Sequence, residues 1–166
     1  MTTNETKDMT NPVVAIEAAK SGVKELAGAN LSGVALRHAN MRYANLRNAE
    51  LCNADLTGTN LSGADLRHAN LAGTCLAVAS LENADLEGAN LSNADLWRAN
   101  LQGTDLRCTN LSGADLERAN LSASDLRGAD LSGANLLGAY LVSAELSEID
   151  FSEVDLSDAF LSDAGR

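Results

Sequence analysis

One large apolar side chain recurs at every fifth position along most of this sequence. From residue 26 to residue 161 these positions number 28, and all are leucine except Met41 and Phe151. A small residue, usually alanine, stands two positions earlier, and asparagine or aspartate usually comes directly before the leucine. The repeating unit is therefore Ala-(Asn/Asp)-Leu followed by two variable residues, the second of which is frequently glycine.

A period of five fits neither an α-helix nor a flat strand. In a helix successive leucines would be rotated by about 140° and form no stripe. In a strand they would alternate between the two faces. The pattern is consistent if the chain turns a corner once per repeat, so that four repeats close a coil of 20 residues with leucine and alanine inside. Asparagine, aspartate and glycine suit such corners because they favour turns or tolerate unusual φ angles.

This run resembles the pentapeptide-repeat family over about 140 of the 166 residues. The resemblance implies an all-β fold, a right-handed quadrilateral (four-sided) β-helix. The 28 repeats predict about seven coils and, at about 4.8 Å per stacked layer, a rod roughly 33 Å long. The resemblance also implies that dimerisation through the C-terminal end is relevant, because some members of the family assemble in that way.

The exposed apolar edge at each end of a stacked rod needs a cap or a partner. At the N-terminal end, Asn11 suits a helix N-cap, Pro12 the first helical position and Gly22 the helix end. We therefore expect a disordered polar segment over 1–10, a capping helix over 11–23 and the β-helix over 24–166. Val13, Ile16 and Ala19 or Lys20 fall on one face of the expected helix.

The C-terminal coils depart from the repeat pattern. Ile149 and Val154 replace alanine, and Phe151 replaces leucine. Outward positions that are polar in earlier coils become apolar, and these are Leu137, Tyr140, Val142 and Phe160. Two interpretations remain open: local repacking of a terminal coil, or a C-terminal homodimer that buries these residues.

Two further outward surfaces carry residues that differ from the usual polar positions of the repeat. One carries a column of arginines, interrupted by Glu87, beside a column of aspartates. The arginines are Arg47, Arg67, Arg107 and Arg127, and the aspartates are Asp65, Asp85, Asp105 and Asp125. It predicts either a solvated salt-bridge lattice or a partner-binding face. The other carries Val78 and Trp97, the only tryptophan, with Leu137 further along. Exposed aromatic residues are enriched at binding hot spots.

The charge excludes several classes of partner. With 23 acidic and 12 basic residues the net charge is -11, which disfavours direct binding to nucleic acid or to an anionic membrane. Residues 1–10 hold no apolar stretch typical of a secretory signal, and no run approaches the roughly 18 apolar residues of a membrane span. The odd count of three cysteines also favours a reducing compartment. We expect a cytoplasmic protein.

The 20-residue register separates the side chains that carry chemistry. His38 and His68 fall on opposite sides, and Cys52, Cys75 and Cys108 fall on three different sides. We therefore expect no metal site, no cofactor and no catalytic residues, and hence no enzyme. The sequence predicts a non-catalytic structural or protein-interaction module whose partner it does not identify.

The alternative function comes from the family resemblance. Some pentapeptide-repeat proteins are acidic mimics of DNA that bind DNA gyrase or topoisomerase and protect it from inhibitors. Those members tend to have phenylalanine-rich cores, whereas this core is almost entirely leucine.

Overall fold

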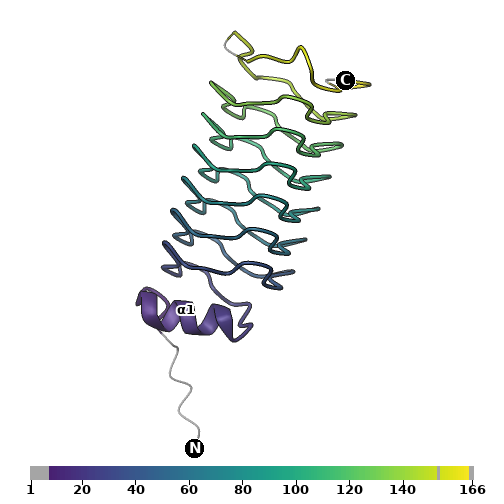
Figure 1. Cartoon of the computed structure of the whole chain (residues 1–166). Helices are drawn as coiled ribbons and strands as arrows, with labels where there is room; N and C mark the ends of the chain where they lie inside the picture. The colour runs from purple at the N-terminus through teal and green to yellow at the C-terminus, as the bar shows by residue number, and fades with distance from the viewer. Residues whose placement is uncertain (1–7, 153, 165–166) are drawn as a thin grey trace, which may run out of the picture.

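Parallel β-bridges join residues that lie 20 positions apart along a rod of stacked coils (Figure 1). The computed structural model describes residues 8–152 and 154–164. Successive bridges are five residues apart from Glu25–Asn45 to Asp125–Glu145, and one further bridge joins Tyr140 to Phe160. Each coil therefore has four sides, and each side contributes one bridge residue. The expected disordered segment over 1–10 lies mostly outside the described residues.

Most repeats turn a corner in the same way. In the repeat at Leu56, the amide of Thr59 donates to the Leu56 carbonyl at 2.9 Å, and Gly58 has a φ of +65°. Asp55 accepts a hydrogen bond from the amide of Thr57 through Oδ1 at 3.2 Å. A positive φ at the third residue is what a type II turn requires, and the aspartate fixes the chain on the approach to the corner.

Backbone hydrogen bonds hold the coils together, and leucine and alanine fill the space inside. The amide of Leu56 donates to the Cys75 carbonyl at 2.8 Å, and the amide of Cys75 donates to the Ala54 carbonyl at 2.9 Å. Where threonine replaces the small alanine, its hydroxyl is also satisfied, since Thr59 Oγ1 donates to the Leu36 carbonyl at 2.7 Å. Among the described residues no buried side-chain nitrogen or oxygen atom is left without a hydrogen bond.

Helix α1 (Pro12–Lys20) covers the N-terminal end of the rod (Figure 1). Asn11 caps it by accepting a hydrogen bond from the amide of Val13 at 3.0 Å. The buried residues are Ala15, Ala18 and Ala19. Of the residues expected to share one face of the helix, Ala19 is buried, Ile16 is half-buried and Val13 is 63% exposed. Alanines let the helix approach the first coil closely, and Val13 in the first turn points away from that contact.

At the other end of the rod the last coil separates from the coil beneath it (Figure 1). Among the described residues no bridge joins 130 to 150 or 135 to 155, although both neighbouring sides are paired. Two clefts of about 490 and 210 Å³ occupy these unpaired sides. The amides of Leu131 and Leu136 find no backbone acceptor in the described part of the chain, unlike the equivalent amides of Leu111 and Leu116.

Side-chain volume explains where the coil opens. Ile149 and Val154 stand on the two open sides, at positions where alanine lets the wall lie close to the axis. Val34 occupies the same kind of position near the N-terminal end, yet it is buried and its side remains paired. One valine is therefore tolerated, whereas two β-branched residues on adjacent sides, in a coil stacked on one side only, force the walls apart.

No helix within the described ranges is long and apolar enough to cross a lipid bilayer, since α1 has nine residues.

Candidate functional site

The arginine and aspartate columns form ion pairs both within a coil and between coils. Arg67 binds Asp65 of its own coil through Nη2 at 2.6 Å, and its Nε lies 3.2 Å from Asp85 of the next coil. Arg127 binds Asp125 in the same way at 2.6 Å, and Arg47 lies 4.0 Å from Asp65. Each aspartate therefore faces a guanidinium group of its own coil, of an adjacent coil or of both.

Arg107 makes contacts across three coils. It binds Asp105 of its own coil at 2.6 Å, Glu87 of the preceding coil at 3.2 Å and Asp125 of the following coil at 3.8 Å. Because Glu87 stands where the column otherwise holds arginine, it gives Arg107 a carboxylate on the preceding coil. These side chains are about one-third exposed, so each pair contributes little to stability by itself.

The ion pairs change the titration of the aspartates. Hydrogen bonds from the arginine two residues further on lower the pKa of Asp65, Asp105 and Asp125 below the usual value. The same contacts raise the pKa values of Arg67 and Arg107. These three aspartates are therefore ionised and matched by arginine at neutral pH.

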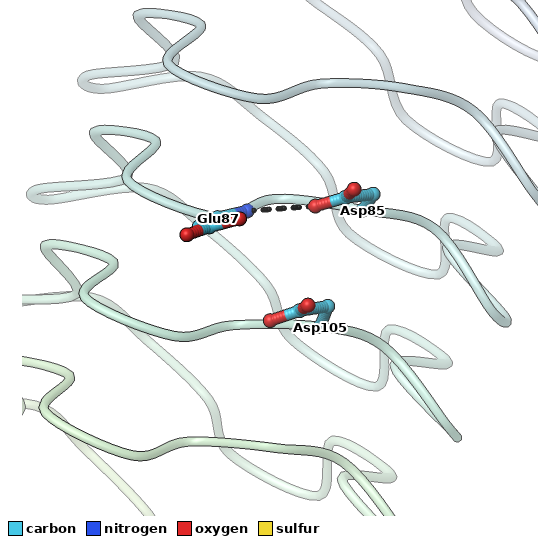
Figure 2. Close-up of side chains that lie close together, drawn as sticks. All are labelled: Asp85, Glu87 and Asp105. Carbon is cyan, nitrogen blue, oxygen red and sulfur yellow. Dashed lines mark hydrogen bonds between the residues drawn. The ribbon is translucent and has the colours of Figure 1, made fainter.

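Three carboxylates on this side approach one another closely enough to share a cation. Oxygen atoms of Asp85, Glu87 and Asp105 lie within 4.8 Å of one another. Figure 2 shows Asp85 and Asp105 on adjacent coils, with the amide of Glu87 donating to Asp85 Oδ1 at 3.1 Å. Arg67 and Arg107 already bind all three carboxylates, so an ion would have to displace guanidinium groups. The cluster escaped the sequence analysis because only histidine and cysteine were considered as ligands.

A second side of the rod carries aromatic and aliphatic residues. Val78 and Leu137 are exposed, and Trp97 is half-buried. Near the C-terminal end, the rings of Tyr140 and Phe160 stack with centroids 4.7 Å apart and an angle of 11° between planes. These two rings replace the column of asparagines at residues 40, 60, 100 and 120, in which Asn120 Nδ2 donates to Asn100 Oδ1 at 3.3 Å.

Two arginines that the sequence analysis did not single out stand between these residues. Arg98 packs beside Trp97, with its guanidinium carbon 5.2 Å from the ring centroid. Arg98, Arg118, Gly138, Tyr140 and Phe160 line a shallow groove of about 500 Å³. Reading the sequence in columns of 20 would have placed Arg98, Arg118 and Gly138 one above another beside the aromatic pair.

The remaining candidate residues are dispersed. Val142 lies in the corner that follows Tyr140 and is half-buried, and it does not line the groove. The three cysteines are free, and Cys75 and Cys108 are exposed. The side chains of His38 and His68 each cover a glycine of the next coil, Gly58 and Gly88.

A family model described as pentapeptide repeats matches the chain in eight copies, over residues 25–58, 44–83, 79–118 and 118–158. Among curated proteins none matches the sequence. Among solved structures, a trypsin-treated variant of the plasmid-mediated fluoroquinolone resistance protein QnrB1 is 23% identical, with a TM-score of 0.56 over 84% of this chain and 76% of that chain. A pentapeptide repeat protein from the thylakoid lumen of Arabidopsis thaliana is 29% identical, with a TM-score of 0.50 over 71% of this chain and 70% of that chain.

Proposed function

Because this chain belongs to the pentapeptide-repeat family over residues 25–158, we propose that it is a non-catalytic protein-interaction module. The rod holds side chains at regular positions on rigid faces, as repeat proteins that bind partners do. The observation that carries the proposal is the corner with Val78, Trp97 and Leu137 together with the adjacent side that holds Tyr140 and Phe160. Apolar and aromatic residues gather there although most outward positions of the rod are polar.

Affinity capture from the source cell tests this proposal. We expect the Trp97→Ala and Phe160→Ala variants to recover less partner than the unaltered protein, because truncating an aromatic hot spot costs at least about 2 kcal/mol of binding energy. Tyr43→Ala is the matched control, since Tyr43 is 69% exposed and stands several coils away, near the N-terminal end of the rod. Equal recovery by all four proteins would refute a role for the aromatic side.

A second candidate function is acidic DNA mimicry directed at DNA gyrase or a related topoisomerase. Seven acidic residues and no lysine or arginine lie between residues 145 and 163, which gives this end a concentrated negative charge. Against it, the aspartates of the charge ladder are matched by arginines, whereas DNA presents about one unmatched charge per 1.7 Å. A gyrase supercoiling assay with added protein tests this candidate. If the protein neither inhibits gyrase nor rescues it from a quinolone, DNA mimicry is refuted.

The open C-terminal end supports a further proposal, a tail-to-tail homodimer in the cytoplasm. Phe160 and Leu161 are 52% and 41% exposed at that end, and a second copy would cover both. Analytical ultracentrifugation should then show a dimer at micromolar concentration and a monomer for the Phe160→Ala, Leu161→Ala variant. A monomer at high micromolar concentration for the unaltered protein would refute the dimer.

A further inference from the structure

The groove between the two arginines and the two stacked rings is chemically unlike the rest of the surface. Its lining contains two cationic and two aromatic side chains and no carboxylate, in a protein whose net charge is -11. Gly138 forms its floor, and the Cγ of Arg118 lies 3.3 Å from the point where a Cβ on residue 138 would stand. The missing side chain therefore leaves the hollow that the stem of Arg118 crosses.

The arginines of this groove differ from those of the charge ladder in their partners. Arg98 has no ion pair with any described residue, and its guanidinium group packs against the ring of Trp97. Arg118 lies 3.6 Å from Glu117 beside it and its side chain is 64% exposed. By contrast, Arg67 and Arg107 each bind carboxylates of two or more coils. The guanidinium groups at the groove thus keep donors available for an external acceptor.

The aromatic wall provides an apolar surface next to these donors. Tyr140 and Phe160 are 45% and 52% exposed, although their rings already bury one face against each other. Another asparagine at residue 140 would have continued the ladder from Asn120 at no cost in exposed apolar area. An exposed aromatic pair at the edge of a cationic groove suits a ligand that carries negative charge and an apolar side chain together.

We infer that this groove binds an acidic peptide segment of a protein partner, with carboxylates on Arg98 and Arg118 and an apolar side chain against Tyr140 and Phe160. The inference rests on the proposed function as an interaction module and names the class of partner. Paired arginines recognise carboxylates through charge-assisted hydrogen bonds, and the apolar contact adds orientation.

Charge favours a peptide over a nucleic acid. A nucleic acid strand carries a phosphate at every nucleotide and would meet the surrounding acidic surface beyond the two arginines. A peptide with a few carboxylates places its charge only where the arginines stand. A lone small anion would leave the aromatic wall unused.

Fluorescence anisotropy with defined probes tests the inference. The probe is a fluorescein-labelled peptide of about twelve residues that carries two glutamates beside leucine and phenylalanine among uncharged polar residues, in the manner of an extended peptide ligand. We expect it to bind the full chain, and a matched peptide with glutamine in place of glutamate to bind about tenfold more weakly or worse. Trp97, the only tryptophan, should report the same event through a change in its emission.

Substitutions locate the binding. The Arg98→Gln, Arg118→Gln variant should bind the acidic peptide about tenfold more weakly. The Tyr140→Asn, Phe160→Asn variant should also lose affinity while extending the asparagine ladder. Arg42→Gln is the matched control, because Arg42 also packs on an aromatic ring, with its guanidinium carbon 5.2 Å from the Tyr43 centroid, outside the groove.

Four results would overturn the inference: no binding of the acidic peptide, equal affinity for the glutamine peptide, unchanged binding by the Arg98→Gln, Arg118→Gln variant, or tighter binding of an oligothymidylate probe. Circular dichroism establishes that each variant is folded. The proposed function fails separately, since it depends on whether Trp97→Ala and Phe160→Ala lose the captured partner.

Discussion

Replacing Ile149 and Val154 with alanine is expected to close the last coil onto the rod. Both positions belong to columns that otherwise hold alanine or threonine, apart from Val34. With the small side chain restored, the walls at residues 150 and 155 can approach those at 130 and 135. The expected structure has the two bridges that are missing among the described residues.

The magnitude follows from the hydrogen bonds on an intact side. The side joining residues 110 and 130 has three backbone hydrogen bonds, from Leu111, Gly113 and Asp130, at 2.8–2.9 Å. A net 0.5–1.5 kcal/mol for each bond gives roughly 2–4 kcal/mol per closed side. The two substitutions also remove five carbon atoms from partly buried side chains, at up to about 0.8 kcal/mol each. For two sides the gain is roughly 4–8 kcal/mol, which exceeds the loss of up to about 4 kcal/mol, so a net increase in the free energy of unfolding is expected.

Amide hydrogen exchange is the sensitive assay because it reports the local bonds directly. We expect the amides of Leu131 and Leu136 to exchange about tenfold to a hundredfold more slowly in the Ile149→Ala, Val154→Ala variant. The amides of Leu111 and Leu116 are the internal reference, since they are already bonded, both at 2.8 Å.

The converse substitution makes the test symmetrical. Ala89 and Ala94 occupy the same two columns three coils earlier and are buried. Ala89→Ile with Ala94→Val should destabilise the rod by about 1–3 kcal/mol or more and speed exchange nearby. If Leu131 and Leu136 exchange as fast after the alanine substitutions as before, side-chain volume is not what opens the last coil.

Three other outcomes are expected. Gly73→Ala should lower the free energy of unfolding in urea by about 1–3 kcal/mol, because Gly73 has a φ of +64° and its new Cβ would stand 2.6 Å from Asn53 Oδ1; an unchanged midpoint would contradict this. Arg107→Gln should lower the melting temperature at pH 7. Because folding lowers the pKa of Asp105, this stabilisation is present above the unfolded pKa near 3.8 and is lost as the pH falls through the folded pKa. The difference in melting temperature between the variant and the unaltered protein should therefore shrink in acid. A difference in melting temperature that persists at pH 2 would refute the role of the Arg107–Asp105 pair. Asn11→Ala should cost about 1 kcal/mol by removing the cap on α1, measured by urea unfolding, whereas Asn11→Ser should cost much less.

The charge ladder was predicted from the sequence, and the stacked rings follow from the same register. A coil of 20 residues places Arg67 near Asp85, and Tyr140 beside Phe160, on adjacent coils, and the side chains meet there. The groove at Arg98 and Arg118 was missed. The groove exists because residue 138 has no side chain and because the Arg118 stem runs across that position, and the direction of a side chain cannot be deduced from the sequence register alone.

The sequence by itself determined the period, the inward and outward positions, and the sides that carry charge or aromatic rings. It could do so because slipping the register by one residue would expose every leucine of a coil, so no other register buries the core. The tertiary structure alone decided that Val13 points to solvent, that the last coil stands open, and that two arginines face a hollow beside the aromatic pair. Those features depend on clearances between packed atoms, which are smaller than a methyl group and follow from neighbours on other coils.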